Sequence, residues 1–322
     1  MMNTVNTPET NVTVEKFRSY KTMRLVSKII AYVLLVILSF NWLYPLLWIV
    51  ISSFVVQTDG SPISVPYTYF PDLSTGLRRY GIENYIHLFT DGYVRTNSEG
   101  VAVGTFTYYF VSWFTNTLFV AAVSCVISTA FTLMVAYVMS KLKFSFRKTY
   151  LNIALVIGLF PGFMSMIAIY YMLKAIGLTG SLWALILCNS AGAGTGFYVA
   201  KGFFDVVPDS LIESAKLDGA TNAQIFLHII LPMSKPIVIY QALMAFTGPW
   251  MDFIFAKVIL GNDATLWTVS VGLYNSLFGA QTDGSTFSIF AAGCVCVAIP
   301  IVTLFMFLQK YYVEGVTAGS VK

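Results

Sequence analysis

The polar residues best placed to do chemistry lie together in residues 205–235, a hydrophilic stretch between two apolar segments. Pro208 stands where a helix can begin, because its missing amide hydrogen would have no partner in the first turn. Apolar residues then recur at helical spacing, at Leu211, Ile212 and Ala215. Gly219 comes soon after, and glycine is the usual residue just past the end of a helix. The pattern predicts a short helix that ends in a chain reversal.

A second short helix is expected directly after this turn. Thr221 and Gln224 have the spacing of a capping box, which starts a helix. Apolar residues lie on one face of it, at Ile225, Phe226, Ile229 and Ile230. Two short helices joined by a glycine turn can fit a groove on a partner protein, with apolar anchors and a few charges that set the register. An ordinary connecting loop with surface helices fits the same residues, which leave both interpretations open.

Catalytic and metal-binding motifs are absent from the sequence. It has no Gly-x-x-x-x-Gly-Lys-Ser/Thr loop for ATP phosphates, no His-Glu-x-x-His and no Gly-x-Ser-x-Gly. The four cysteines fall inside apolar segments without histidine or acidic neighbours, so they are interpreted as small packing residues rather than disulfide partners or metal ligands. The basic residues form no nucleic-acid-binding stripe. The sequence therefore predicts no enzyme, no cofactor, no metal and no nucleic acid partner.

The composition indicates a protein embedded in lipid. Hydrophobic residues make up 57% of the 322 residues and charged residues 11%, whereas soluble domains carry about 25% charged residues. About 20 apolar residues span the hydrocarbon core of a bilayer as a helix. Six runs qualify, at residues 25–52, 113–140, 150–173, 181–204, 236–260 and 287–308. The expected fold is an all-α integral membrane protein with six transmembrane helices.

Lysine and arginine residues predict the topology. Cytoplasmic segments of membrane proteins are enriched in these residues. With the N-terminus inside, 14 of the 19 basic residues fall on the cytoplasmic side. This predicts a cytoplasmic N-terminal segment 1–24, an external loop 53–112, a permease core from residue 113 onward that contains the stretch 205–235, and a cytoplasmic tail 309–322. The first apolar run begins too late for a cleaved secretion signal, so it is expected to be a retained span.

One carboxylate, Asp252, lies inside a predicted span. An ionisable group in a membrane is costly and is a functional candidate by default. Gly248 and Pro249 can break the helix just before it, and broken helices line substrate sites in transporters. Residues Gly248, Pro249, Trp250 and Asp252 are therefore candidates for a pathway or gate. Bonding of Asp252 to a neighbouring backbone, without a transport role, remains an equal alternative.

The stretch 205–235 resembles the EAA motif of binding-protein-dependent ABC importer permeases. The resemblance is carried by Glu213, Ser214, Ala215, Asp218, Gly219, Ala220, Phe226, Ile229, Leu231 and Pro232. The Asp-Gly-Ala ending is similar to the carbohydrate branch, and Ser214 departs from the second alanine of the motif. Trp250-Met-Asp-Phe253 resembles the Trp-Asn-Asp/Glu-Phe stretch of the family. The end of the chain resembles that of the maltose-type permease, and the match covers about residues 110–322 and the first span.

The resemblance implies a type I importer architecture and a division of labour. In such permeases the helix-turn-helix docks in a cleft of a separate ATPase. By this resemblance Glu213 would contact the ATPase and Gly219 would form the turn. Phe226 and Leu231 would support the helix-turn-helix. ATP-driven closure of the ATPase would then tilt the spans, because ATP binds the closed state more tightly. The implied partners are a second related permease, two ATPase copies and an extracytoplasmic solute-binding protein. The resemblance implies that the protein is embedded in the lipid of the plasma membrane of a prokaryote. It also implies an oligosaccharide substrate, such as a maltodextrin.

Several alternatives remain open at this point. An ABC permease for another sugar, a polyol or a glycerophosphodiester would have a similar sequence. An ion-coupled secondary transporter needs several intramembrane ionisable residues, of which only Asp252 lies well inside a span. An integral-membrane enzyme needs a catalytic cluster, which two histidines and scattered acids do not supply. The external segment 261–285 is a candidate contact for a binding protein.

Overall fold

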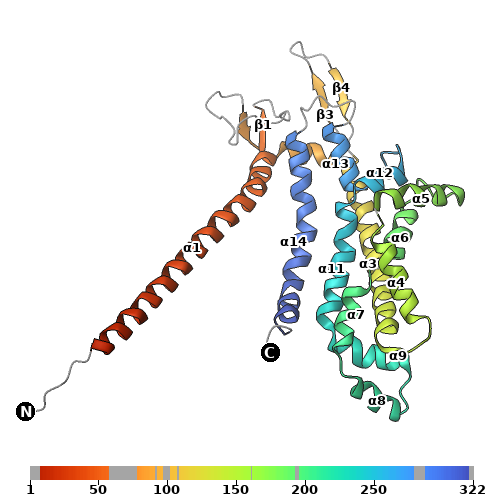
Figure 1. The fold of residues 1–322 in the computed structure, drawn as a ribbon. Coiled ribbons are helices and arrows are strands. Elements are labelled where there is room, and N and C mark those ends of the chain that lie inside the picture. The colour runs from red at the N-terminus through yellow and green to blue at the C-terminus, as the bar shows by residue number, and fades with distance from the viewer. Residues whose placement is uncertain are drawn as a thin grey trace, which may run out of the picture.

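The computed structural model describes residues 8–57, 78–90, 93–96, 102–106, 109–160, 162–192, 196–278 and 287–318. Nearly all of them form helices, with two small strand pairs at one end and the segment of α8 (Asp209–Leu217) and α9 (Asn222–Ile225) at the other (Figure 1). The first turn of α1 and the last turn of α14 lie at the end where α8 and α9 are found. The described part of the chain is therefore an elongated helical bundle with two distinct ends.

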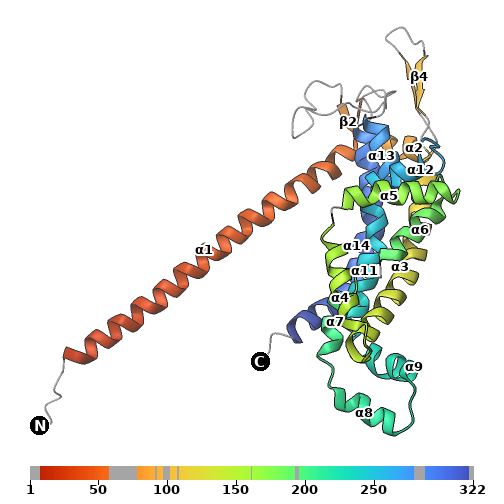
Figure 2. The same ribbon diagram turned by 45° about the vertical axis from the view of Figure 1, so that its right-hand side comes forward.

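The first helix, α1 (Pro8–Ser53), leans away from all the others (Figure 2). Its apolar portion, Met23–Ser53, is long enough to cross a bilayer, and none of its most hydrophobic window is buried inside the chain. It meets the rest of the bundle through α14 (Phe287–Ala318). The ring of Trp48, near the end of α1, lies 5.2 Å from that of Phe287, at the start of α14. The apolar surface of α1 is thus left for lipid or for another chain.

The centre of the bundle is α3 (Phe110–Lys141), whose 32 residues rise about 48 Å. It packs against helices from most of the chain. These are α6 (Leu182–Ala191), α7 (Tyr198–Asp205), α11 (Lys235–Met251) and α13 (Val269–Phe278). Gly272 of α13 allows the closest of these approaches, because a Cβ atom there would overlap the ring of Trp113. α3 is therefore the element through which the others are connected.

Three of the expected spans are interrupted. Residues 150–173 divide between α4 (Arg147–Gly158) and α5 (Gly162–Ala175), and α5 lies across the bundle in both views (Figures 1 and 2). Residues 181–204 divide between α6 and α7, and residues 236–260 between α11 and α12 (Ile254–Leu260). Proline and glycine near the first break weaken helical continuity, because proline lacks a donor and glycine has a high conformational entropy cost.

The number of membrane crossings remains a prediction. Three described helices are long and apolar enough to cross a membrane, namely Met23–Ser53, Phe110–Lys141 and Phe287–Gln309. A fourth exists if the bent pair Asn222–Met233 and Lys235–Met251 counts as one span. The expected six spans are thus represented by continuous helices in three cases and by helix pairs in the others. The expected class, an all-helical fold with membrane-spanning candidates, agrees with the structure.

The segment between α1 and α3 contains the strands. β1 (Val55–Gln57) pairs antiparallel with β2 (Arg78–Tyr80), α2 spans Glu83–Phe89, and β3 (Tyr93–Thr96) pairs antiparallel with β4 (Ala102–Phe106). Buried Asn84 of α2 holds this end together. Its Nδ2 atom donates to the carbonyls of Ser53 and Val55, both at 2.9 Å, and its Oδ1 atom accepts from Ser288 Oγ at 3.0 Å. One side chain therefore joins the ends of α1, β1 and α14.

Candidate functional site

The turn expected at Gly219 is formed as a complete helix-ending motif. α8 runs from Asp209 to Leu217, one residue after Pro208. Gly219 has φ 82°, a left-handed conformation that favours glycine. The amide of Gly219 donates to the carbonyl of Lys216 at 3.0 Å, and the amide of Ala220 to that of Ala215 at 2.9 Å. These are the two bonds of a Schellman motif, which satisfies carbonyls at the helix end and fixes the exit direction of the chain.

The second helix begins at the predicted capping box. The Thr221 amide donates to Gln224 Oε1 at 2.8 Å, and the Gln224 amide donates to Thr221 Oγ1 at 3.3 Å. The helix consists of α9 (Asn222–Ile225), a π-helical turn (Phe226–Ile230) and α10 (Leu231–Met233). It meets α11 at a bend of 88°. The π-helical turn was not expected, and it precedes Pro232, which has no amide hydrogen to continue the regular bonding pattern.

One face of this helix pair is buried against the bundle. The buried residues are Ile212, Ile225 and Ile230, and they belong to a cluster with side chains of α3 and α7. The motif residues Ala215, Ala220, Phe226, Ile229 and Leu231 pack partly against the same cluster. The ring of Phe226 lies 5.1 Å from that of Tyr137 on α3. These apolar side chains fix the pair to the end of the bundle.

The opposite face carries the charged motif residues. Glu213, Ser214, Asp218 and Gly219 are exposed. Leu217, at the tip of α8, is 90% exposed. Asp218, Gln224 and His228 line a shallow groove beside the glycine turn. The structure therefore brings the candidate residues into one element. Its apolar motif residues face the bundle, whereas Glu213, Asp218 and the neighbouring Leu217 face outward.

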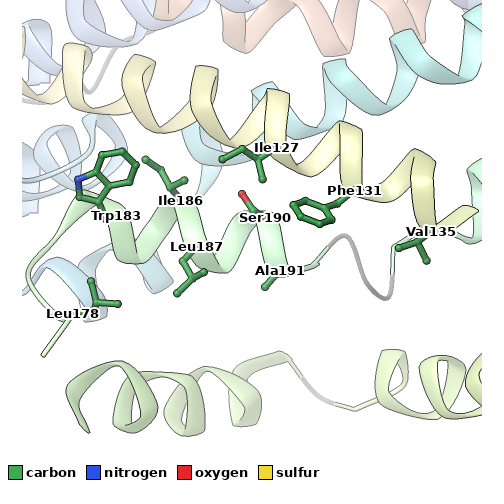
Figure 3. Close-up of a pocket in the computed structure, with 9 residues that line it drawn as sticks. All are labelled: Ile127, Phe131, Val135, Leu178, Trp183, Ile186, Leu187, Ser190 and Ala191. Atoms are coloured by element: carbon green, nitrogen blue, oxygen red, sulfur yellow. The ribbon is translucent and has the colours of Figure 1, made fainter. Parts of the chain in front are cut away.

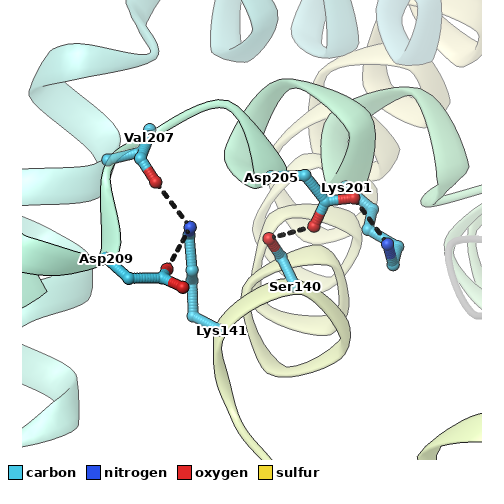
Figure 4. Close-up of polar contacts among 6 residues, drawn as sticks. All are labelled: Ser140, Lys141, Lys201, Asp205, Val207 and Asp209. Carbon is cyan, nitrogen blue, oxygen red and sulfur yellow. Dashed lines mark hydrogen bonds and ion pairs between the residues drawn. The ribbon is translucent and has the colours of Figure 1, made fainter.

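Charged contacts attach the start of α8 to the end of α3. Lys141 Nζ lies 2.8 Å from Asp209 Oδ1 and donates to the carbonyl of Val207 at 2.6 Å (Figure 4). The hydrogen bond from the Lys141 ammonium, together with its positive charge, lowers the pKa of the Asp209 carboxyl below its ordinary value. Lys141 was not among the residues expected to matter, and its only signal in the sequence is a basic residue at the end of an apolar run.

The second set of candidates lies at the break between α11 and α12. Asp252 is half-buried and its Oδ1 atom accepts from the amide of Phe255 at 3.2 Å, so it caps the first turn of α12. Ser270 Oγ donates to the Asp252 carbonyl at 2.6 Å. Trp250 and Pro249 are buried, and Gly248 is exposed. α11 continues through Gly248 and Pro249 to Met251, so the helix breaks at Asp252 rather than just before it, and Asp252 has a backbone partner whether or not it also lines a pathway.

The connection after α12 is held on α3. Trp113 Nε1 donates to the carbonyl of Ala264 at 2.7 Å, and Asn116 Nδ2 donates to that of Thr265 at 2.9 Å. The amide of Val269 donates to Thr117 Oγ1 at 2.8 Å. The first half of the candidate binding-protein contact 261–285 is therefore firmly anchored. Residues 279–286 lie outside the described part of the chain.

A groove between α3 and α6 is chemically different from both sites. Side chains of the two helices face one another across it, among them Ile127, Phe131, Ile186 and Leu187 (Figure 3). Its lining is almost entirely apolar, and Ser190 contributes the hydroxyl group in it. A sugar needs several placed hydrogen-bonding groups for orientation. This groove therefore does not qualify as a sugar site.

Comparison with known proteins identifies the family. Residues 128–317 match the model of the binding-protein-dependent transport system inner membrane component. The chain belongs to this family. Its matched region includes α8, Gly219, the capped second helix and Asp252, so the expected family is confirmed, while the assignment of residues 205–235 to the EAA motif stays a prediction. Members of the family are membrane permease subunits of ABC importers, in which a separate ATPase hydrolyses ATP.

Two curated permeases of this family are similar along nearly their whole length. The galactooligosaccharides transport system permease protein GanQ of Bacillus subtilis (strain 168) is 32% identical over 94% of this chain and 98% of its own. The maltodextrin transport system permease protein MalD of Streptococcus pneumoniae (strain ATCC BAA-255 / R6) is 32% identical over 94% of this chain and 99% of its own. The similarity extends beyond the matched family region into the N-terminal part of the chain.

Two solved structures share the fold. A crystal structure of a bacterial ABC transporter that imports the acidic polysaccharide alginate contains a chain with a TM-score of 0.68 and 19% identity, covering 89% of this chain and 97% of that one. A chain in the alginate transporter complexed with an alginate pentasaccharide-bound periplasmic protein has a TM-score of 0.59 and 18% identity, covering 90% and 96%. The helical architecture described above is thus that of an ABC importer permease.

Proposed function

We propose that this permease subunit imports an oligosaccharide and that residues 205–235 couple its movement to a separate ATPase. The observation that carries the coupling proposal is the two-sided character of the α8–α9 pair. Its apolar side is fixed to the bundle through Ile212 and Ile225, while Glu213, Asp218 and Leu217 face outward. A protruding element with one apolar anchor and flanking acids suits a groove on a partner protein.

The motif residues have separate roles in this proposal. Glu213 contacts the ATPase directly, and Ser214 and Asp218 flank that contact on the exposed face. Gly219 sets the angle between the two helices through its positive φ. Ala215, Ala220, Phe226, Ile229, Leu231 and Pro232 support the pair against the bundle and direct the chain into α11. A push on the exposed face would then be passed to the helices behind it.

The proposed orientation places α8 and α9 in the cytoplasm. Fourteen of the 19 basic residues fall on the side expected to be inside. The first turn of α1 and the last turn of α14 lie at the α8–α9 end, and the strands lie at the other (Figure 1). In this orientation both termini are cytoplasmic, and the segment 53–112 faces the binding protein together with the loop after α12. Six crossings follow if each interrupted helix pair counts as one span.

The proposed assembly contains a second related permease and two copies of an ATPase. The apolar surface of α1 supports a membrane-embedded partner, because none of its most hydrophobic window is covered by the chain's own helices. A single α8–α9 pair supports one ATPase contact per permease, so two permeases suit two ATPase copies. A solute-binding protein on the outer side delivers the sugar, as in the alginate transporter whose structure includes a periplasmic protein.

The substrate class rests on the named relatives. These transport galactooligosaccharides, maltodextrin or arabinooligosaccharides according to their names. A maltodextrin-like oligosaccharide is therefore our leading proposal. Gly248, Pro249, Trp250 and Asp252 are proposed to lie at the pathway or its gate, because a half-buried carboxylate stands there at a helix break.

Transport by the complete complex tests this function. The permeases, the ATPase and the binding protein would be reconstituted in proteoliposomes and supplied with radiolabelled maltotriose, galactotriose, arabinotriose and glycerol phosphodiesters. We expect the vesicles to take up at least one trisaccharide. This uptake should require ATP on the side of the membrane where the ATPase is bound, and it should continue when an ionophore dissipates the ion gradients. Uptake that persists without ATP but collapses with the ion gradient would refute the ABC mechanism. Uptake of the phosphodiester alone would refute the oligosaccharide class.

A further inference from the structure

The end of α3 is attached to the corner between α7 and α8 at two consecutive residues (Figure 4). Ser140 Oγ donates to Asp205 Oδ1 at 2.6 Å, and Asp205 Oδ2 lies 2.6 Å from Lys201 Nζ. The next residue, Lys141, reaches the other side of the corner and binds Val207 and Asp209 through its ammonium group. The corner between the two helices is therefore held from both sides by one turn of α3.

Of the two attachments, that of Lys141 involves a buried charged side chain. Its side chain is only 4% exposed, whereas the side chain of Asp209 is 74% exposed. An ammonium group removed from water is costly unless hydrogen-bond acceptors replace the water. The carbonyl of Val207 and the carboxylate of Asp209 provide those acceptors. Movement of the corner away from α3 would therefore break the hydrogen bonds to Val207 and Asp209 together, so the contact holds the corner at two points.

Few other contacts join α8 to the bundle. Of its residues only Ile212 is buried, and Ala215 is partly covered. The helix projects beyond the end of the other helices in both views (Figures 1 and 2). The Lys141 contact lies at the first residue of α8 and Ile212 one turn later. These two contacts join the first half of α8 directly to the bundle.

We propose that Lys141, through Val207 and Asp209, is the joint that transmits movement of α8 to α3. Because α3 packs along α11, α6 and α7, a displacement delivered to its end reaches the helices that form the rest of the bundle. Lys141 is a positioning residue in this scheme, since it holds α8 rather than touching the ATPase or the sugar. The inference rests on the proposed coupling function of α8 and specifies where the force enters the bundle.

The test compares sugar imported per ATP hydrolysed in the reconstituted complex, using the trisaccharide that wild-type vesicles import best. Lys141→Met keeps the length and apolar stem of the side chain and removes its charge. We expect this variant to assemble with the ATPase and to hydrolyse ATP near the wild-type rate. Sugar imported per ATP should fall about tenfold, within the usual range of coupling between sites. Lys141→Arg should restore most of that ratio, because it retains donors for both acceptors.

Lys143→Met is the matched control. Lys143 is exposed and lies two residues away in the same connection, so its substitution should leave the ratio unchanged. A Lys141→Met complex that assembles and imports with the wild-type ratio would overturn the inference, as would an equal loss in Lys143→Met. If Lys141→Met loses assembly, ATP hydrolysis and uptake together, the role of Lys141 is merely structural. That result would also overturn the inference, unless Asp209→Asn assembles normally and imports less sugar per ATP.

Asp209→Asn decides the matter if Lys141→Met fails to assemble. The Asp209 side chain is exposed, so its substitution should not affect folding. We expect normal assembly and a smaller fall in sugar per ATP, about threefold, because an exposed ion pair contributes little and the Val207 contact remains. If Lys141→Met does not assemble and Asp209→Asn imports as much sugar per ATP as the wild type, the proposed role of Lys141 is refuted. Wild-type vesicles that import none of the sugars would instead refute the proposed function, so the two failures are distinguishable.

Discussion

Substitutions at Gly219 should impair transport in the order of their backbone preferences. Gly219 has φ 82° and its amide donates to Lys216. Alanine has room there, since a Cβ atom at this position would meet nothing within 4 Å, but the left-handed conformation costs an L-residue about 1–2 kcal/mol. That cost changes the ratio of correctly turned to unturned chains by a factor of about 5 to 30. Asparagine tolerates this conformation better and should lie nearer to wild type.

Gly219→Pro should be the most severe variant. The proline ring fixes φ near −65°, which has the opposite sign to the native value, and removes the amide that bonds to Lys216. The turn cannot form, so α8 is redirected relative to α9. Because α8 projects beyond the bundle, we expect insertion in the membrane to be preserved and ATP-driven uptake to be lost.

The assay measures membrane insertion, co-purification of the ATPase and sugar uptake for the whole Gly219 series. We expect insertion to stay constant while the other two quantities fall in the order glycine, asparagine, alanine, proline. The series separates a requirement for a backbone conformation from a requirement for a small side chain, since alanine is smaller than asparagine. Normal uptake by the proline variant, or a lower uptake with asparagine than with alanine, would refute the reasoning from φ.

Three further substitutions test the packing that supports these functions. Phe226→Ala removes the ring beside Tyr137 and should lower stability by about 1–3 kcal/mol, because the site is partly buried; the melting temperature in detergent measures this, and an unchanged value would contradict it. Asn84→Ala leaves buried carbonyls without a donor and should cost about 1–3 kcal/mol, seen as faster proteolysis of the α1–α2 segment; equal rates would show that this contact is dispensable. Gly272→Ala should overlap the ring of Trp113 and reduce the yield of folded protein, and a normal yield would argue against the close approach of α13 and α3.

The ends of the α8–α9 pair could be predicted from the sequence because their signals are local. The Thr221–Gln224 capping box and the positive φ of Gly219 depend on residues within one turn, and both are present in the structure. The membrane-embedded class followed from composition and apolar run length. The family expected from the sequence was confirmed by the match over residues 128–317, whereas the roles of Glu213–Pro232 within it stay a prediction.

Features that depend on tertiary contacts could not be predicted in the same way. The breaks in the runs 150–173 and 181–204 coincide with local signals, Pro161-Gly162 and the polar or small residues 189–196. These signals show where a helix can break, but they do not indicate that α5 lies across the bundle. Lys141 meets Val207 and Asp209 across 66 and 68 residues of chain, so no local pattern indicates the contact. The capping role of Asp252 requires the helix break that follows it. Sequence reasoning identified Asp252 as unusual for a span but not its structural partner.

The contact between α8 and the ATPase is tested most directly by a photo-crosslinking residue placed at Leu217. This side chain is 90% exposed at the tip of α8, so the substitution should not disturb the fold. The control is the same residue at Ile82, which is 62% exposed and directly precedes α2, at the end of the bundle opposite α8 (Figure 2). After illumination of the assembled importer, we predict an ATPase adduct from position 217 and none from position 82. An ATPase adduct from position 82, or none from position 217 in a complex that contains the ATPase, would contradict the coupling account.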